Sequence, residues 1–178
     1  KEVKLVALTK TKPFELIIEA YKGEHKIFEE NKAQELIKKY EALPDDIEWH
    51  FIGHLQTNKA KYLVPFVSLI HGIDSFKILK TVNKEAKKND RIIPCLLQFH
   101  IAEESTKFGL SLDEAREFFE SEFFRGMKNV SINGVMGMAT FTDNKMQIRN
   151  EFRMLRSVFE NLRKDYFSNK ADFREISM

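Results

Sequence analysis

The sequence predicts an α/β protein built on a parallel sheet. Seven apolar segments of strand length alternate with six segments whose apolar residues repeat with a helical period. Strict alternation favours right-handed strand–helix–strand units, which form either a closed barrel or an open doubly wound sheet. No glycine-rich fingerprint follows the first strand, which argues against the dinucleotide-binding form of the open sheet.

The first strand and helix carry a lysine between them. Residues 6–8 are a continuous apolar run, typical of a strand that is buried on both faces. Pro13 suits a first helical turn, and apolar residues then recur with a helical period over residues 14–21. Lys10 therefore stands at the carboxyl end of a strand, which is the end where parallel barrels bind ligands.

The remaining elements follow in the same order. Further strands are expected at residues 25–28, 48–52, 67–73, 91–100, 130–139 and 174–178. Helices are expected between them, the second with Ala33, Leu36, Ile37 and Tyr40 on one face, the third capped by Thr57, and the fifth opening on a capping box of Ser111 and Glu114. An eight-stranded barrel needs one more helix and strand, so we expect a barrel that is cut short.

The composition is that of an ordinary globular domain. The 178 residues are 43% hydrophobic and 31% charged, with a net charge of +2, which gives no electrostatic reason to expect nucleic acid as a partner. Cys95 is the single cysteine, so no disulfide can form within the chain, as is usual in a reducing compartment. Neither a signal peptide nor a run of about 18 apolar residues is present, so we expect a soluble cytoplasmic protein without a membrane span.

Lys10 is the first candidate for chemistry. A lysine at this position can be desolvated, which lowers its pKa and frees the amine to attack a carbonyl carbon. The like charge of Lys12 would act in the same direction. The alternative is a surface lysine that ends the strand, because most lysines are exposed.

The densest group of polar residues follows the third strand, over residues 49–59. His50 and His54 are four residues apart, but this metal-binding spacing works on a helix, and here Gly53 interrupts the chain. Without further ligands, zinc is not favoured. We expect His50 to point into the barrel.

Polar or sulfur-bearing residues also end three other strands, at Glu30–Asn31, residues 98–100, and Met136 with Met138. Each pair taken alone is as readily explained by core packing or helix capping. Because the strand ends of a barrel meet on one face, their convergence indicates a ligand site.

Four segments together resemble one known family. They are residues 8–13 (Leu-Thr-Lys-Thr-Lys-Pro), 30–31 (Glu-Asn), 49–59 (Trp-His-Phe-Ile-Gly-His-Leu-Gln-Thr-Asn-Lys) and 134–138 (Gly-Val-Met-Gly-Met). They are similar to the pyridoxal phosphate homeostasis protein family, the single-domain relatives of the alanine racemase amino-terminal barrel. The resemblance extends from Leu5 to Met178.

The resemblance implies a TIM-like (β/α)8 barrel of the alanine racemase N-terminal type, incomplete here with about seven strands. Residues 1–178 would form a single pyridoxal-phosphate-binding barrel domain that lacks its N-terminal helix and C-terminal strand. Pyridoxal 5′-phosphate (PLP) would be held as a Schiff base on Lys10, with Asn31, His50, Met136 and Ser177 around it. No catalytic residue and no metal are implied.

The function implied is that of a carrier that buffers PLP for vitamin B6 homeostasis, not of an enzyme. Its partners would be PLP and PLP-dependent apoenzymes, and we expect a monomer. The alternative is a PLP-dependent amino-acid racemase or another Schiff-base enzyme. Two-domain racemases draw one of two bases from a second domain, whereas we expect a single domain here. A third interpretation is a barrel scaffold without a ligand.

The chain departs from the family pattern in two places. Glu29 replaces the usual glycine before Glu-Asn, where it would either strain the backbone and repel the cofactor phosphate, or adopt ordinary strand geometry and point to solvent. The family also continues beyond Met178 into a glycine- and serine-rich segment that grips the phosphate. We therefore expect a weakened phosphate site and a gap between the first and seventh strands.

Overall fold

The structure is a computed structural model that describes residues 3–102 and 108–178. Seven parallel strands form one sheet in the order of the sequence, β1 to β7. The strands are β1 (Ala7–Leu8), β2 (Ile27–Glu30), β3 (Glu48–Phe51), β4 (Leu69–Ile73), β5 (Ile93–Phe99), β6 (Val130–Gly137) and β7 (Glu175–Ser177). The helices are α1 (Phe14–Lys22), α2 (Ala33–Ala42), α3 (Thr57–Leu63), α4 (Phe76–Lys88), α5 (Leu112–Glu120), α6 (Glu122–Arg125) and α7 (Lys145–Asp165).

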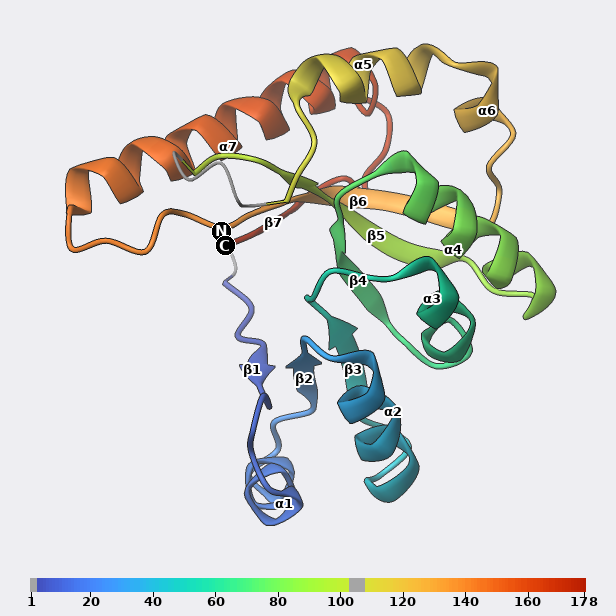
Figure 1. Cartoon of the computed structure of the whole chain (residues 1–178), viewed down its shortest axis with the longest axis vertical. Helices are drawn as coiled ribbons and strands as arrows, with labels where there is room; N and C mark the ends of the chain where they lie inside the picture. Colours follow the sequence, from blue (N-terminus) through green and yellow to red (C-terminus); the bar gives the residue numbers. More distant parts are fainter. Residues whose placement is uncertain (1–2, 103–107) are drawn as a thin grey trace.

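The sheet curls into an arc with the helices along its outer side (Figure 1). Among the described residues, β1 pairs only with β2 and β7 pairs only with β6, so the arc is open between β1 and β7. The predicted incomplete barrel, with its gap between the first and last strands, is confirmed.

The core lies between the sheet and the helix layer. Helix α4 illustrates why the sequence folds this way: its residues Ile78, Leu79, Val82 and Ala86 are buried, whereas the lysines between them face outward. A helix with one apolar stripe buries that stripe against the sheet. The core is continuous over the described strands.

The first strand differs from its prediction. β1 has two residues, and the Leu8 side chain is 48% exposed, so the expected burial on both faces is wrong. The reason is that β1 is an edge strand of an open arc: among the described residues it pairs with β2 alone, so no described strand shields its other edge.

Two helix predictions also change. Thr57 is the first residue of α3, and Gln56 occupies the N-cap position, so Thr57 is not the cap. Seven helices are described where six were expected, because Ser121 ends α5 and caps the additional short helix α6. The capping box is confirmed: the Ser111 hydroxyl accepts from the Glu114 backbone, and the Glu114 carboxylate accepts from the Ser111 backbone.

One glycine brings two strand ends together. A Cβ atom on Gly53 would lie 2.0 Å from the Asn31 carbonyl oxygen. No side chain fits at that distance, so a glycine is required for the chain leaving β3 to pass next to the chain leaving β2. This contact places the segment after His50 beside Asn31.

Candidate functional site

A tight turn presents Lys10 at the end of β1. The Lys12 backbone N–H donates to the Thr9 carbonyl oxygen at 2.9 Å, and the Thr11 hydroxyl donates to the Lys10 carbonyl oxygen at 2.6 Å. Thr11 has a φ of 59°, a left-handed conformation that is unfavourable for a β-branched residue. Lys10 itself is exposed, so the desolvation considered for its side chain is not found here.

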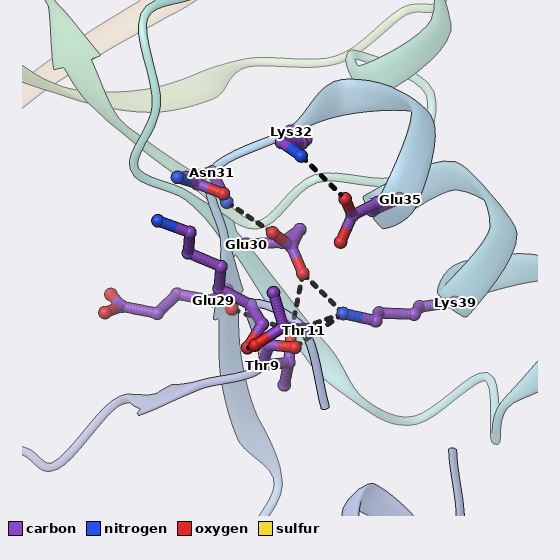
Figure 2. A network of polar contacts seen from close by, with 9 residues as sticks. Thr9, Thr11, Glu29, Glu30, Asn31, Lys32, Glu35 and Lys39 are labelled. Atoms are coloured by element: carbon purple, nitrogen blue, oxygen red, sulfur yellow. Dashed lines mark hydrogen bonds and ion pairs between the residues drawn. The ribbon is translucent and has the colours of Figure 1, made fainter. Parts of the chain in front are cut away.

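A buried polar network supports this turn from the helix side (Figure 2). The ammonium of Lys39 on α2 forms an ion pair with Glu30, and it donates to the Thr9 carbonyl oxygen at 2.7 Å and to the Thr9 hydroxyl at 3.2 Å. Thr9, Glu30 and Lys39 are exposed by 2%, 0% and 4%. We call these three residues the Glu30–Lys39–Thr9 network. It uses all three donors of the ammonium group.

Asn31 adjoins this network. Its backbone N–H donates to Glu30 Oε1 at 2.9 Å, whereas its side-chain oxygen is buried and has no hydrogen-bond partner among the described residues. A buried carbonyl oxygen without a partner is costly, so such an atom indicates a place where a polar ligand fits.

A second polar group crosses the concave side of the sheet. His50 Nδ1 on β3 lies 3.0 Å from His71 Nε2 on β4, and His71 Nδ1 lies 2.8 Å from the Ser177 hydroxyl on β7. We call this group the His50–His71–Ser177 chain. It confirms that His50 is directed into the sheet interior.

The two histidines are held neutral. Burial, with a contribution from Lys4, lowers the pKa of His50 to about 4. Burial, with a contribution from His50, lowers the pKa of His71 to about 3. At neutral pH the His50–His71–Ser177 chain is therefore an uncharged row of hydrogen-bonding side chains.

Met136 lies beside the His50–His71–Ser177 chain. It is 5% exposed and is paired in register with Ser177 on β7 and Gln98 on β5. Met138, expected to share its face, follows the end of β6 and is 44% exposed.

Glu29 lies between the two groups in the sheet. Its partners in register are Leu8 on β1 and His50 on β3, and Figure 2 shows its side chain on the side of β2 opposite Glu30. Burial raises the pKa of Glu29 to about 7.

Each interpretation of Glu29 is wrong in one part, and the ordinary strand geometry expected by the second is confirmed. Its backbone has strand geometry and is not among the described residues with positive φ, so the strained-backbone interpretation is wrong. The side chain is half-buried, so the purely solvent-facing interpretation is wrong as well.

Three members of these groups escaped the sequence analysis. His71 lies within an apolar strand segment, where a single polar residue gives little signal, and Thr9 opens a run of four polar residues in which nothing distinguishes it. Lys39 lies three residues after the buried Leu36 on α2, so helical spacing places it on the buried face. Tyr40, which was expected on that face, is 39% exposed.

His54 belongs to neither group. Its Nδ1 lies 2.5 Å from Asp74 Oδ2, and its ring stacks on Phe108 with 4.5 Å between centroids. In residues 3–102 and 108–178, no group of three or more His, Cys, Asp or Glu side chains is arranged to hold a metal ion. Within the same ranges, no helix has the length and apolar character needed to span a membrane.

Comparisons with known proteins place this geometry in a family. The family model of the alanine racemase N-terminal domain matches residues 1–174. The pyridoxal phosphate homeostasis protein of Aquifex aeolicus is 40% identical, over 92% of this chain and 71% of the relative. The human protein of the same name is 33% identical, over 98% of this chain and 66% of the relative.

Solved structures agree with this assignment. PipY of Synechococcus elongatus superposes with a TM-score of 0.90 without PLP and 0.85 with PLP bound, at 28% and 27% identity, covering 99% of this chain and 81% of PipY. An alanine racemase of Clostridium difficile shares the fold alone, with a TM-score of 0.77 at 10% identity over all of this chain and 48% of the racemase. The chain therefore belongs to the alanine racemase N-terminal domain family and, within it, to the group of pyridoxal phosphate homeostasis proteins.

Proposed function

We propose that this protein binds PLP through Lys10 and buffers the cofactor without catalysing a reaction of its own. Relatives at 33% and 40% identity carry the name pyridoxal phosphate homeostasis protein, and the structure of PipY contains PLP. In this proposal, Asn31, His50, Met136 and Ser177 surround the cofactor.

The observation that carries the proposal is that Lys10 and Asn31 stand at the ends of adjacent strands. An exposed primary amine stands at a strand end, and the end of the adjacent strand carries a buried amide oxygen without a partner. An amine can bond covalently to an aldehyde, and the amide oxygen can accept a hydrogen bond from a polar ligand. The residues present thus suit an aldehyde cofactor with polar substituents.

The covalent step is a reversible condensation. The Lys10 amine would attack the aldehyde carbon and form the C=N bond, and the aldehyde oxygen would leave as water with the two protons of the amine. Addition of water across the C=N bond returns the free amine and the aldehyde. The bound cofactor supplies its aldehyde as the attachment point; Met136 provides an apolar contact, and the neutral histidines provide a polar wall without adding charge.

Borohydride reduction tests the attachment. Wild-type protein mixed with PLP and then reduced should carry one stable label on Lys10, as mapped by peptide mass spectrometry. Lys10→Ala should abolish this label, whereas Lys12→Ala, the matched control two residues away, should retain it. A label on Lys12 or Lys59, with Lys10→Ala still forming the imine, would overturn the assignment.

The absence of catalysis is tested separately. Incubation of the PLP-loaded protein with amino acids in D₂O should leave the α-proton in place, whereas a racemase would exchange it. We further propose PLP-dependent apoenzymes as recipients of the cofactor, a single-domain monomer as the working form, and the cytoplasm as its location.

A further inference from the structure

We propose that Lys39 is a positioning residue: through the Glu30–Lys39–Thr9 network, it holds the turn that presents Lys10. This inference rests on the proposed function, because it assigns Lys39 a role in the reaction of Lys10. Lys39 does not touch the reacting amine in this proposal; it acts through the backbone of Thr9.

Lys39 acts on the turn through the Thr9 carbonyl oxygen. It accepts both the Lys12 backbone N–H at 2.9 Å and the Lys39 ammonium at 2.7 Å. The first contact closes the turn, and the second ties that turn to α2. A charge-assisted hydrogen bond is stronger than a neutral one, so the tie fixes the peptide that precedes Lys10.

The turn needs such support. Thr11 holds a left-handed φ of 59°, which is unfavourable for a β-branched side chain and persists only where the surroundings enforce it. β1 provides little support, because it has only two residues and pairs with β2 alone among the described residues.

The same ammonium also organises Asn31. Glu30 accepts from Lys39 and from the Asn31 backbone, on different carboxylate oxygens. One buried cation therefore fixes the strand ends that carry Lys10 and Asn31, as Figure 2 shows for the contacts around Glu30. Without this support, the turn at Lys10 and the Asn31 backbone would have to be ordered at the time of binding, which costs free energy.

Burial makes a purely solubilising role for Lys39 untenable. Lysine is almost never fully buried unless it is paired, and Lys39 is 4% exposed. Apolar residues at positions 30 and 39 together would fill this space between α2 and the sheet without the cost of desolvating two charges.

The test separates positioning from folding. Lys39→Met alone leaves Glu30 as an unpaired buried charge and can unfold the protein. Glu30→Gln/Lys39→Met removes both charges. The amide oxygen of the new side chain can still accept from the Asn31 backbone, and its NH2 group can donate to the Thr9 hydroxyl, which itself donates to the Glu29 carbonyl oxygen. Lys38→Met, an exposed neighbour on the same helix, is the matched control.

Two measurements apply to each folded variant, with folding checked by thermal unfolding. Amide hydrogen exchange by NMR reports the Lys12 N–H without any cofactor, and we expect it to exchange at least tenfold faster in Glu30→Gln/Lys39→Met. Reduction after brief exposure to free pyridoxal, which lacks the phosphate, reports the ratio of label on Lys10 to label on Lys12. We expect this ratio to fall at least fivefold.

A folded double variant that keeps either the Lys12 exchange rate or the labelling ratio within twofold of wild type overturns the proposal. An equal change in Lys38→Met does so too, because it would show that any loss of charge on α2 suffices. If wild type carries no label on Lys10, the proposed function fails, and the exchange rate of Lys12 alone then decides whether Lys39 holds the turn.

Discussion

The two polar groups of this protein differ in how they avoid an unpaired buried charge: one contains an ion pair, and the other consists of neutral side chains. In the Glu30–Lys39–Thr9 network, the Lys39 ammonium and the Glu30 carboxylate form an ion pair, and each also contacts further hydrogen-bonding atoms. The His50–His71–Ser177 chain contains no carboxylate, and its histidines stay neutral. A buried group thus remains charged where the fold supplies a counter-charge, and otherwise becomes neutral.

The two groups also connect different parts of the arc. The network joins neighbouring elements β1, β2 and α2, whereas the chain joins β3, β4 and β7 across the concave side. Loss of the first should therefore loosen one edge of the sheet, and loss of the second should loosen the contact between its middle and its last strand.

The largest effect is expected from breaking the charged network on one side. Lys39→Met leaves the Glu30 carboxylate buried without its partner and should lower the free energy of unfolding by about 3–5 kcal/mol. Urea unfolding followed by circular dichroism measures this change. The matched control is Lys32→Met, which removes an exposed ion pair with Glu35 on the same helix and should cost about 0.5 kcal/mol. Equal losses in the two variants would show that the burial of the network is unimportant.

Acid should destabilise the protein through the His50–His71–Ser177 chain. The pKa values of His50 and His71 are lowered in the folded protein to about 4 and about 3, whereas an unfolded histidine has a pKa of about 6.5. The unfolded state therefore binds more protons below pH 6.5, and stability falls as the pH falls. Between pH 6.5 and 5.5 the two histidines together should remove about 2 kcal/mol from the free energy of unfolding.

Urea unfolding at each pH measures the slope, and the double variant His50→Asn/His71→Asn serves as the control. We expect the variant to lose the contribution of the histidines, which is the difference between the two slopes. The slope that it keeps includes the opposing contribution of Glu29, whose raised pKa makes the folded state bind the extra proton in this interval. If its slope equals that of the wild type, the acid sensitivity lies elsewhere in the protein.

The smallest effect concerns Glu29, which lies between the two groups. Burial raises its pKa to about 7, so its carboxyl group ionises as the pH rises from 6 to 8. The added charge should weaken binding of the anionic PLP by about threefold, the scale of a solvent-screened interaction of 0.5–1 kcal/mol. Titration of PLP binding by absorbance at both pH values measures the change.

Glu29→Gln keeps the size of the side chain and removes the titrating proton. The part of the pH dependence that is due to Glu29 should disappear in this variant. Because the backbone of Glu29 has ordinary strand geometry, Glu29→Gly should give no additional gain from relieved strain. A much larger gain from glycine than from glutamine would contradict this reasoning.

Local patterns predicted much of the fold. The helical period of residues 14–21 and the capping box at Ser111 are properties of neighbouring residues, and both were found as expected. The alternation of strands and helices predicted the parallel order, and seven strands predicted an open barrel. The expected cofactor-binding roles of Lys10, Asn31, His50, Met136 and Ser177 stay predictions.

The sequence by itself determined the order of the elements and the position of Lys10 at a strand end, because periodicity and turn chemistry are local. Only the tertiary structure decided that Lys39 is buried against Thr9, that His71 meets a serine 106 residues away, and that Glu29 is half-buried. These outcomes depend on the register of the strands and on how each helix packs on the sheet. A buried polar group is defined by the partner that packing brings to it, and no local pattern contains that partner.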